Sequence, residues 1–304
     1  METDFLRPFI NRIDLENREV YGAQLYHDGR IVQEWHRRSD YSPECIYSGT
    51  KTFVGAAIGI AREEGLLDIH KPWLEYLPEY EKFAAEGTER QTILNLLQMQ
   101  GGKDEIPIDC RLDYPDDMLE LWAGMPLTSE PGTKWEYINL CSYTLGRVIE
   151  KVSGQSLRDY LLPRLFNPMG IQYPHWFADR FGHFYGLGWM YLHISEYAKI
   201  GRLLLDDGRY EGRQLLSPDY ARAMHTDIVT TDLDPAAHPR KRLGYGYQVW
   251  MRGDGSYSAT GLYGQICLVD PKRNAVFTMQ GHEEDPWRTG SLYDIIFEEV
   301  LDRL

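Results

Sequence analysis

Apolar positions near the N-terminus change from a helical to a strand-like spacing. Residues 4–16 repeat apolar side chains at intervals that predict a short amphipathic helix. Two β-rich runs follow at residues 20–26 and 31–35, and the Asp28-Gly29 pair between them is typical of a hairpin turn. The chain is therefore expected to open with a helix and a β-hairpin.

The long middle part of the chain is mainly helical in pattern. Ser48 and Lys51 open a segment whose apolar residues recur at helical spacing, with Gly65 as a typical stop. Pro, Asp and Gly are frequent between residues 104 and 135, which indicates long surface loops. Further helices are predicted at residues 73–77, 92–97, 118–122, 140–152, 157–165 and 195–205, and one more begins at Ser217-Pro218.

Strand-like runs return in the last quarter of the chain. Residues 245–251, 256–259, 265–269 and 275–280 read as four strands, and residues 292–304 read as an amphipathic helix. Strands at both ends with helices between them predict an α/β (α+β) fold, in which an antiparallel sheet of N- and C-terminal strands is flanked by helices and carries an inserted, mostly helical lobe. We expect residues 1–70 and 225–304 to form the sheet lobe, residues 71–224 the inserted lobe, and both together one catalytic unit.

Composition narrows the possible partners. The 304 residues include 32 basic and 46 acidic side chains, and the net charge of -14 disfavours nucleic acid and anionic membrane surfaces as partners. The longest apolar run near the front, residues 54–61, is too short to span a bilayer, and no secretion signal is visible, so a cytoplasmic location is expected. The four cysteines are dispersed, which favours packing thiols over a disulfide framework or a zinc site.

The first candidate for chemistry is the pair Ser48 and Lys51. Three residues apart at a helix start, they are expected to lie on the same side, with the amine beside the hydroxyl. A serine hydroxyl becomes a good nucleophile only when a base takes its proton, and a desolvated lysine can do this. Taken alone, a pair of this spacing is better explained by a serine near a helix start and a solvated lysine.

Two further segments could complete such a site. Tyr137 could act as a base if its phenol lies near the Lys51 ammonium, and Asn139 could hold Lys51 or a substrate carbonyl; alternatively, Tyr137 is a turn residue and Asn139 caps the next helix. Residues 258–265 are mostly small and lie between two predicted strands, so a substrate could bind along their backbone; the alternative is an ordinary glycine-bearing bend. In this segment the amide of Leu262 could join that of Ser48 as an oxyanion hole.

Taken together, these segments resemble the serine β-lactamase and penicillin-binding protein superfamily. The resemblance covers residues 20–281 and is carried by Ser48-Gly49-Thr50-Lys51 and Tyr137-Ile138-Asn139. The flanking residues are similar to the class C and esterase branch, namely Glu64-Gly65-Leu66-Leu67-Asp68, Pro131-Gly132-Thr133-Lys134, Gly208-Arg209-Tyr210 and Leu216-Ser217-Pro218. The resemblance implies Ser48, Lys51 and Tyr137 as catalytic residues and the backbone of Ser48 and Leu262 as the oxyanion hole. It also implies substrate contacts from Asn139, Ala259, Thr260, Gly261 and Gln265.

One departure from the superfamily concerns the third motif. β-Lactamases and D-Ala-D-Ala peptidases usually have Lys or His where this chain has Ala259, and that cation ordinarily attracts a substrate carboxylate. The segment looks instead like the esterase and amide-hydrolase members. We therefore expect a hydrolase that cleaves a small-molecule ester, amide or lactam through an acyl-enzyme on Ser48, with no cofactor and no metal. A true β-lactamase or D-Ala-D-Ala carboxypeptidase, and an acyl-binding sensor or scaffold without turnover, remain alternatives.

Overall fold

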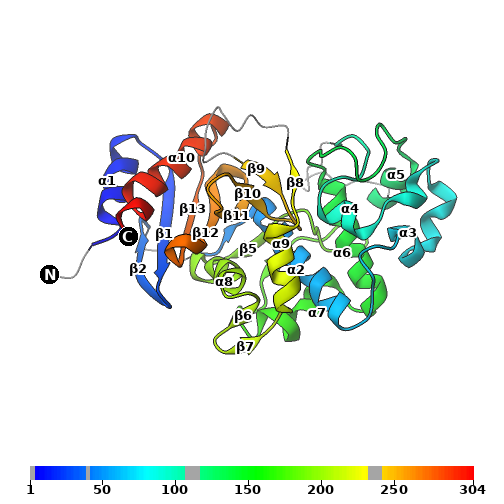
Figure 1. The fold of residues 1–304 in the computed structure, drawn as a ribbon, viewed down its shortest axis with the longest axis horizontal. Helices are drawn as coiled ribbons and strands as arrows, with labels where there is room; N and C mark the ends of the chain where they lie inside the picture. Colours follow the sequence, from blue (N-terminus) through cyan, green and yellow to red (C-terminus); the bar gives the residue numbers. More distant parts are fainter. Residues whose placement is uncertain (1–3, 39–41, 107–116, 232–241) are drawn as a thin grey trace.

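The computed structural model describes residues 4–38, 42–106, 117–231 and 242–304, and its centre is an eight-stranded antiparallel sheet (Figure 1). The strands lie in the order β2-β1-β13-β12-β11-β10-β9-β8. The N-terminal hairpin of β1 and β2 joins the C-terminal strands through the pairing of β1 with β13. The prediction of one sheet built from both ends of the chain is thereby confirmed. The strand bounds are β1 Val20–His27, β2 Arg30–His36, β8 Val229–Thr230, β9 Arg242–Tyr245, β10 Trp250–Arg252, β11 Tyr257–Gly261, β12 Gln265–Asp270 and β13 Ala275–Gly281.

The two faces of the sheet belong to two separate apolar cores. Alternate residues of a strand point to opposite faces, so Leu268 and Phe277 pack under α1 (Arg7–Leu15) and α10 (Pro286–Glu299). Cys267 and Val269 point to the other face, where α8 (Ile194–Leu205) covers β12 and β13. Figure 1 shows α1 and α10 together at one end of the molecule and the α3–α6 helices at the other.

Helix α2 (Thr50–Glu63) runs through the centre of the larger core. All of its residues from Thr50 to Ala61 are buried, as is typical of a helix surrounded by protein. It packs against α6 (Asn139–Ser153), α9 (Pro218–Thr226) and β11. The first residue of α2 directly follows a short 3₁₀ turn, Tyr47–Gly49, and Ser48 lies in this turn.

The remaining helices and short strands surround this centre. The predicted helices of the middle segment are present with small shifts in their ends, and α6 ends at Gly154, whose φ of +67° favours glycine. The bounds are α3 Trp73–Tyr76, α4 Ile93–Leu97, α5 Met118–Gly124, α7 Leu157–Leu161, β3 Glu44–Cys45, β4 His175–Trp176, β5 Met190–Leu192, β6 Arg209–Tyr210 and β7 Arg213–Gln214.

The prediction of a single strand over residues 245–251 is wrong. The chain turns back within this range, so that β9 and β10 form an antiparallel hairpin. A β-carbon on Gly246 would lie 2.0 Å from the Met224 carbonyl oxygen, and Gln248 has a φ of +63°, so neither residue is in a regular strand. The Gln248 side chain, which is buried, also binds Ser142 and the carbonyl of Leu97. These long-range contacts stabilise a turn that the β-rich local sequence does not indicate.

Candidate active site

Lys51 lies buried at the junction of α2, α6 and the segment before β5. Its side-chain nitrogen is 2.9 Å from Ser48 Oγ and 2.8 Å from Asn139 Oδ1, and it also donates to the carbonyl of Leu187. Only 1% of Lys51 is exposed, whereas Ser48 is partly exposed. Ser48 therefore keeps part of its surface in contact with solvent, whereas the amine of Lys51 is shielded from water.

Burial lowers the pKa of Lys51 from 10.5 to about 7, against the opposing effect of the nearby Glu105 carboxylate. A neutral amine has two N–H donors and one lone pair. Asn139 Oδ1 and the Leu187 carbonyl can only accept, so they take the two donors, and the lone pair is left for the hydroxyl of Ser48. In this state Lys51 is oriented as a base for Ser48.

Tyr137 brings its ring to the same amine. Lys51 Nζ lies 5.1 Å from the centre of the Tyr137 ring, within the range of a cation–π contact when the amine is protonated. The ring is stacked on Trp250, with centres 5.3 Å apart and planes at 16°, and meets Tyr245 edge to face. The β9–β10 hairpin, which supplies Trp250 and Tyr245, therefore holds the Tyr137 ring beside Lys51.

Asn139 is the first residue of α6, and its side chain is fixed from both ends. Its amide oxygen accepts from Lys51, while its side-chain nitrogen donates to Glu105 Oε1 at 2.7 Å. Its backbone nitrogen donates to the other oxygen of Glu105 at 2.6 Å. The expectation that Asn139 contacts Lys51 thus agrees with the geometry, and Glu105 is a residue of the site that the sequence did not single out.

The end of β11 passes directly beside the Ser48 turn. A β-carbon on Gly261 would lie 2.0 Å from the carbonyl oxygen of Ile46, so only glycine fits there. Ala259 is buried in the same core as Ile46, and Leu262, which follows Gly261, is 57% exposed. The structure therefore brings Ala259 and Gly261 to the Ser48 side of the sheet, and Leu262 is the next residue along the chain.

One of the expected substrate-binding side chains, that of Thr260, points away from the Ser48 side of the sheet. The Thr260 hydroxyl is 2.7 Å from that of Tyr293 in α10, on the opposite face of the sheet. The side-chain nitrogen of Gln265 donates to the carbonyl of Gly281 at 2.6 Å, and the residue is buried. Strand alternation explains the position of Thr260, because it lies one residue from Ala259. Only the backbone of Thr260 remains a candidate for substrate contact.

Tyr197 of α8 links the serine turn to β11. Its hydroxyl donates to the carbonyl of Ala259 at 2.9 Å. The hydroxyl oxygen of Tyr197 would also lie 2.4 Å from a β-carbon on Gly49, so the residue after Ser48 must be small. This buried tyrosine fixes the spacing between the Ser48 turn and the strand.

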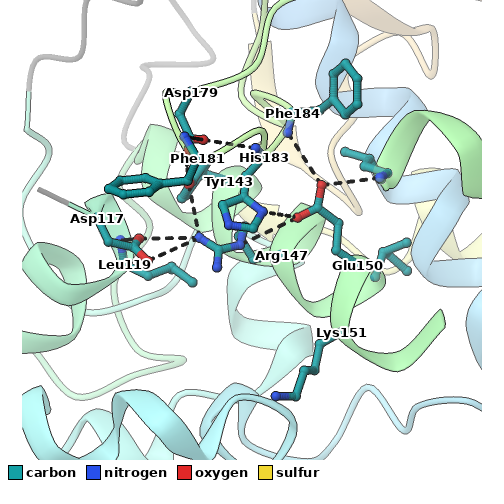
Figure 2. Close-up of polar contacts among 12 residues, drawn as sticks. Asp117, Leu119, Tyr143, Arg147, Glu150, Lys151, Asp179, Phe181, His183 and Phe184 are labelled. Carbon is teal, nitrogen blue, oxygen red and sulfur yellow. Dashed lines mark hydrogen bonds and ion pairs between the residues drawn. The ribbon is translucent and has the colours of Figure 1, made fainter. Parts of the chain in front are cut away.

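A polar network around the buried side chain of Arg147 anchors the loops on both sides of α6 (Figure 2). Arg147 of α6 pairs with Asp117 at 3.3 Å and with Glu150 at 3.6 Å. Glu150 in turn binds His183 Nδ1 at 2.7 Å, and Asp179 accepts the His183 amide at 2.9 Å. The network therefore ties α6, whose first turn reaches the site, to α5 and to the loop that leads toward β5.

The part of the chain that the structure describes contains no group of three His, Cys, Asp or Glu side chains suited to bind a metal ion. Within the same residues, no helix combines the length and the apolar character needed to cross a membrane. Cys45, Cys141 and Cys267 are buried thiols, whereas Cys110 lies outside the described residues.

The antiparallel sheet with helices on both faces and inserted between its strands is the fold of β-lactamase and penicillin-binding-protein-like hydrolases. The chain belongs to the Beta-lactamase family, whose model matches residues 16–295. Among curated proteins it is 25% identical to a 6-aminohexanoate-dimer hydrolase of Paenarthrobacter ureafaciens, over 90% of this chain and 76% of that protein.

Solved structures agree on the fold. An octameric penicillin-binding protein homologue from Pyrococcus abyssi superposes with a TM-score of 0.78 at 17% identity, covering 97% of this chain and 77% of that one. A family VIII carboxylesterase superposes with a TM-score of 0.75 at 18% identity, covering 98% of both chains. The resemblance inferred from the motifs is confirmed, and the similar proteins include one named as a 6-aminohexanoate-dimer hydrolase and one named as a carboxylesterase.

Proposed function

We propose that this protein is a serine hydrolase that cleaves an ester or amide bond through an acyl-enzyme on Ser48. The observation that carries the proposal is the hydrogen-bonding pattern of Lys51. Its two acceptor-only partners, Asn139 Oδ1 and the Leu187 carbonyl, leave the lone pair of the neutral amine for the Ser48 hydroxyl. A pKa of about 7 supplies that neutral form at physiological pH.

In the acylation step Ser48 Oγ bonds to the substrate carbonyl carbon while its proton passes to Lys51. The carbonyl oxygen becomes an oxyanion, for which we assign the amides of Ser48 and Leu262 as donors. The bond to the leaving group then breaks, and Tyr137 together with Lys51 returns the proton to the departing oxygen or nitrogen. In deacylation a water molecule attacks the carbonyl carbon of the acyl-enzyme and loses a proton to Lys51 and Tyr137. The bond to Ser48 Oγ then breaks, and the same pair returns the proton to Ser48.

The proposed substrate is an ester or amide without an essential carboxylate next to the scissile bond. Ala259 occupies the position at which the superfamily usually has a cation. The carboxyl group of Glu105 lies near Lys51, because the side chain of Asn139 is hydrogen-bonded to both residues. Both features are unfavourable for an anionic substrate group. The names of the amide hydrolase and the carboxylesterase among the relatives agree with this choice of substrate.

Release of p-nitrophenol from p-nitrophenyl acetate and butyrate, followed together with intact mass, tests the proposal. Sustained release that is absent in Ser48→Ala supports the hydrolase. A single stable adduct without turnover supports an acyl-binding sensor instead, and the lack of both release and adduct contradicts any acyl chemistry at Ser48. Nitrocefin in parallel tests for β-lactamase activity, which we expect to be weak or absent because residue 259 is an alanine.

A further inference from the structure

Glu105 contacts the proposed catalytic group through one intermediary, and no motif of the sequence includes it. Its two carboxyl oxygens accept from the two nitrogens of Asn139, at 2.6 and 2.7 Å. Asn139 then binds Lys51 Nζ at 2.8 Å through its amide oxygen. Glu105, Asn139 and Lys51 thus form a continuous chain of hydrogen bonds that ends at Ser48.

The direction of each bond in this chain is fixed by the carboxylate. Ionised Glu105 has no donor, so the NH₂ end of the Asn139 side chain must face it and the oxygen end must face Lys51. A glutamine at position 105 would lack this constraint, because its own NH₂ group could donate to Asn139 Oδ1. The Asn139 side chain could then turn over and present a donor to Lys51, which needs an acceptor there.

We propose that Glu105 is a positioning residue that, by binding Asn139 with both oxygens, keeps an acceptor and a negative charge beside the amine of Lys51. The proposal rests on the hydrolase function proposed above. Glu105 is assigned no contact with the substrate, and its effect passes through Asn139 and through the electric field at Lys51. Because Glu105 lies in the loop that follows α4, this loop contributes to the site although it carries none of the three motifs.

The charged and titratable groups around Lys51 come from three elements. Glu105 lies in the loop after α4, Cys141 lies in α6, and Tyr137 precedes α6. Glu105 itself is near a second carboxylate, Glu136, and burial raises the pKa of Glu105. The Glu105 carboxylate opposes the effect of burial on Lys51 and favours its protonated form, so removal of the Glu105 charge is expected to lower the pKa of Lys51 further.

The direct test is an NMR titration of lysine side chains in the wild type and in Glu105→Gln. Lys103 is an internal reference, because burial also lowers its pKa to about 7 but its amine contacts the carbonyls of Trp122 and Ala123. The two signals are assigned with Lys51→Met and Lys103→Met. We expect the midpoint of Lys51 to fall in Glu105→Gln while that of Lys103 stays in place.

Glu136→Gln is the matched control. It removes a neighbouring carboxylate that pairs with Lys134 at 3.0 Å, and no contact joins its side chain to Asn139 within the described residues. This variant should leave the Lys51 midpoint unchanged, and Glu105→Asp, which keeps the charge, should restore it toward the wild-type value. An unchanged Lys51 midpoint in a folded Glu105→Gln protein, or an equal shift in Glu136→Gln, would overturn the proposal, whether or not the protein hydrolyses esters.

Activity gives a second readout. In Glu105→Gln, kcat/KM for p-nitrophenyl acetate should fall by about tenfold or more, as expected for the loss of a charge-assisted hydrogen bond, with kcat affected more than KM. The acidic limb of its pH profile should move to lower pH. A loss of activity with an unmoved limb would indicate a merely structural role. If the wild type shows no Ser48-dependent hydrolysis, the proposed function fails, and the NMR titration still decides the role of Glu105.

Discussion

The contact between Gly49 and Tyr197 offers a test of what fixes the position of the turn that contains Ser48. Gly49 has φ -56° and ψ -25°, a conformation open to any residue, so Gly49→Ala introduces no backbone strain. Its new β-carbon would lie 2.4 Å from the Tyr197 hydroxyl oxygen and 2.9 Å from Cζ. Overpacking of this kind costs about 1–3 kcal/mol in the free energy of unfolding.

Tyr197→Phe removes the hydroxyl and its bond to the Ala259 carbonyl, which should cost about 1–3 kcal/mol by itself. In the double variant the closest atom of the clash is gone, although Cζ remains. The two losses should therefore not add, and the double variant should be more stable than their sum by on the order of 1 kcal/mol. Urea unfolding of the four proteins measures this coupling.

The rate of acylation of Ser48 can be compared in the same four proteins. Gly49→Ala should slow labelling of Ser48 by displacing the turn, and Tyr197→Phe in the same chain should restore part of the rate. Single effects that add to within about 0.5 kcal/mol, with no recovery of labelling, would refute the view that Tyr197 sets the position of the turn.

Three further outcomes follow from the buried charges. First, kcat/KM should rise with pH through about 7, as Lys51 loses its proton, and Lys51→Met should abolish activity in a stopped assay across the range. Second, burial lowers the pKa of both Lys51 and Lys103 from 10.5, the ordinary value expected in the unfolded chain, to about 7 in the folded protein. Between these two pH values the unfolded chain therefore binds more protons than the folded protein. Stability should therefore rise with pH in that window, by about 1.4 kcal/mol per pH unit for each lysine, and urea unfolding of Lys103→Met should show a smaller slope. Third, Arg147→Met removes the cation that pairs with Asp117 and Glu150 and should lower the free energy of unfolding by about 3–5 kcal/mol, measured by urea denaturation against the exposed-pair control Lys151→Met.

Local signals in the sequence were sufficient for much of the fold. Three of these signals depend on the backbone conformation of the residues themselves, and each is found where it was expected: the Asp28-Gly29 turn, the helix end at Gly154 and the small residues around Gly261. Strand alternation also explains which side of the sheet Ala259 faces. The β9–β10 hairpin was missed because its turn depends on Met224 and on the contacts of Gln248, which are distant in sequence.

The candidate site was predictable only in its motif residues. The spacing of Ser48 and Lys51 places them on one turn, but the carbonyl of Leu187 and the carboxylate of Glu105 reach Lys51 and Asn139 only through tertiary packing. Every residue has a backbone carbonyl, so the sequence does not indicate which carbonyl accepts a hydrogen bond from Lys51. Glu105 stands in a loop rich in polar residues, where one more carboxylate does not stand out.

Labelling with a fluorophosphonate, followed by peptide mapping, tests the central claim most directly. A fluorophosphonate reacts with a serine only when a base activates its hydroxyl. We predict one adduct, located on Ser48, which forms faster as pH rises through about 7 and much more slowly in Lys51→Met. An adduct on another residue, or labelling that persists in Ser48→Ala or is unchanged in Lys51→Met, would contradict the role assigned to this pair.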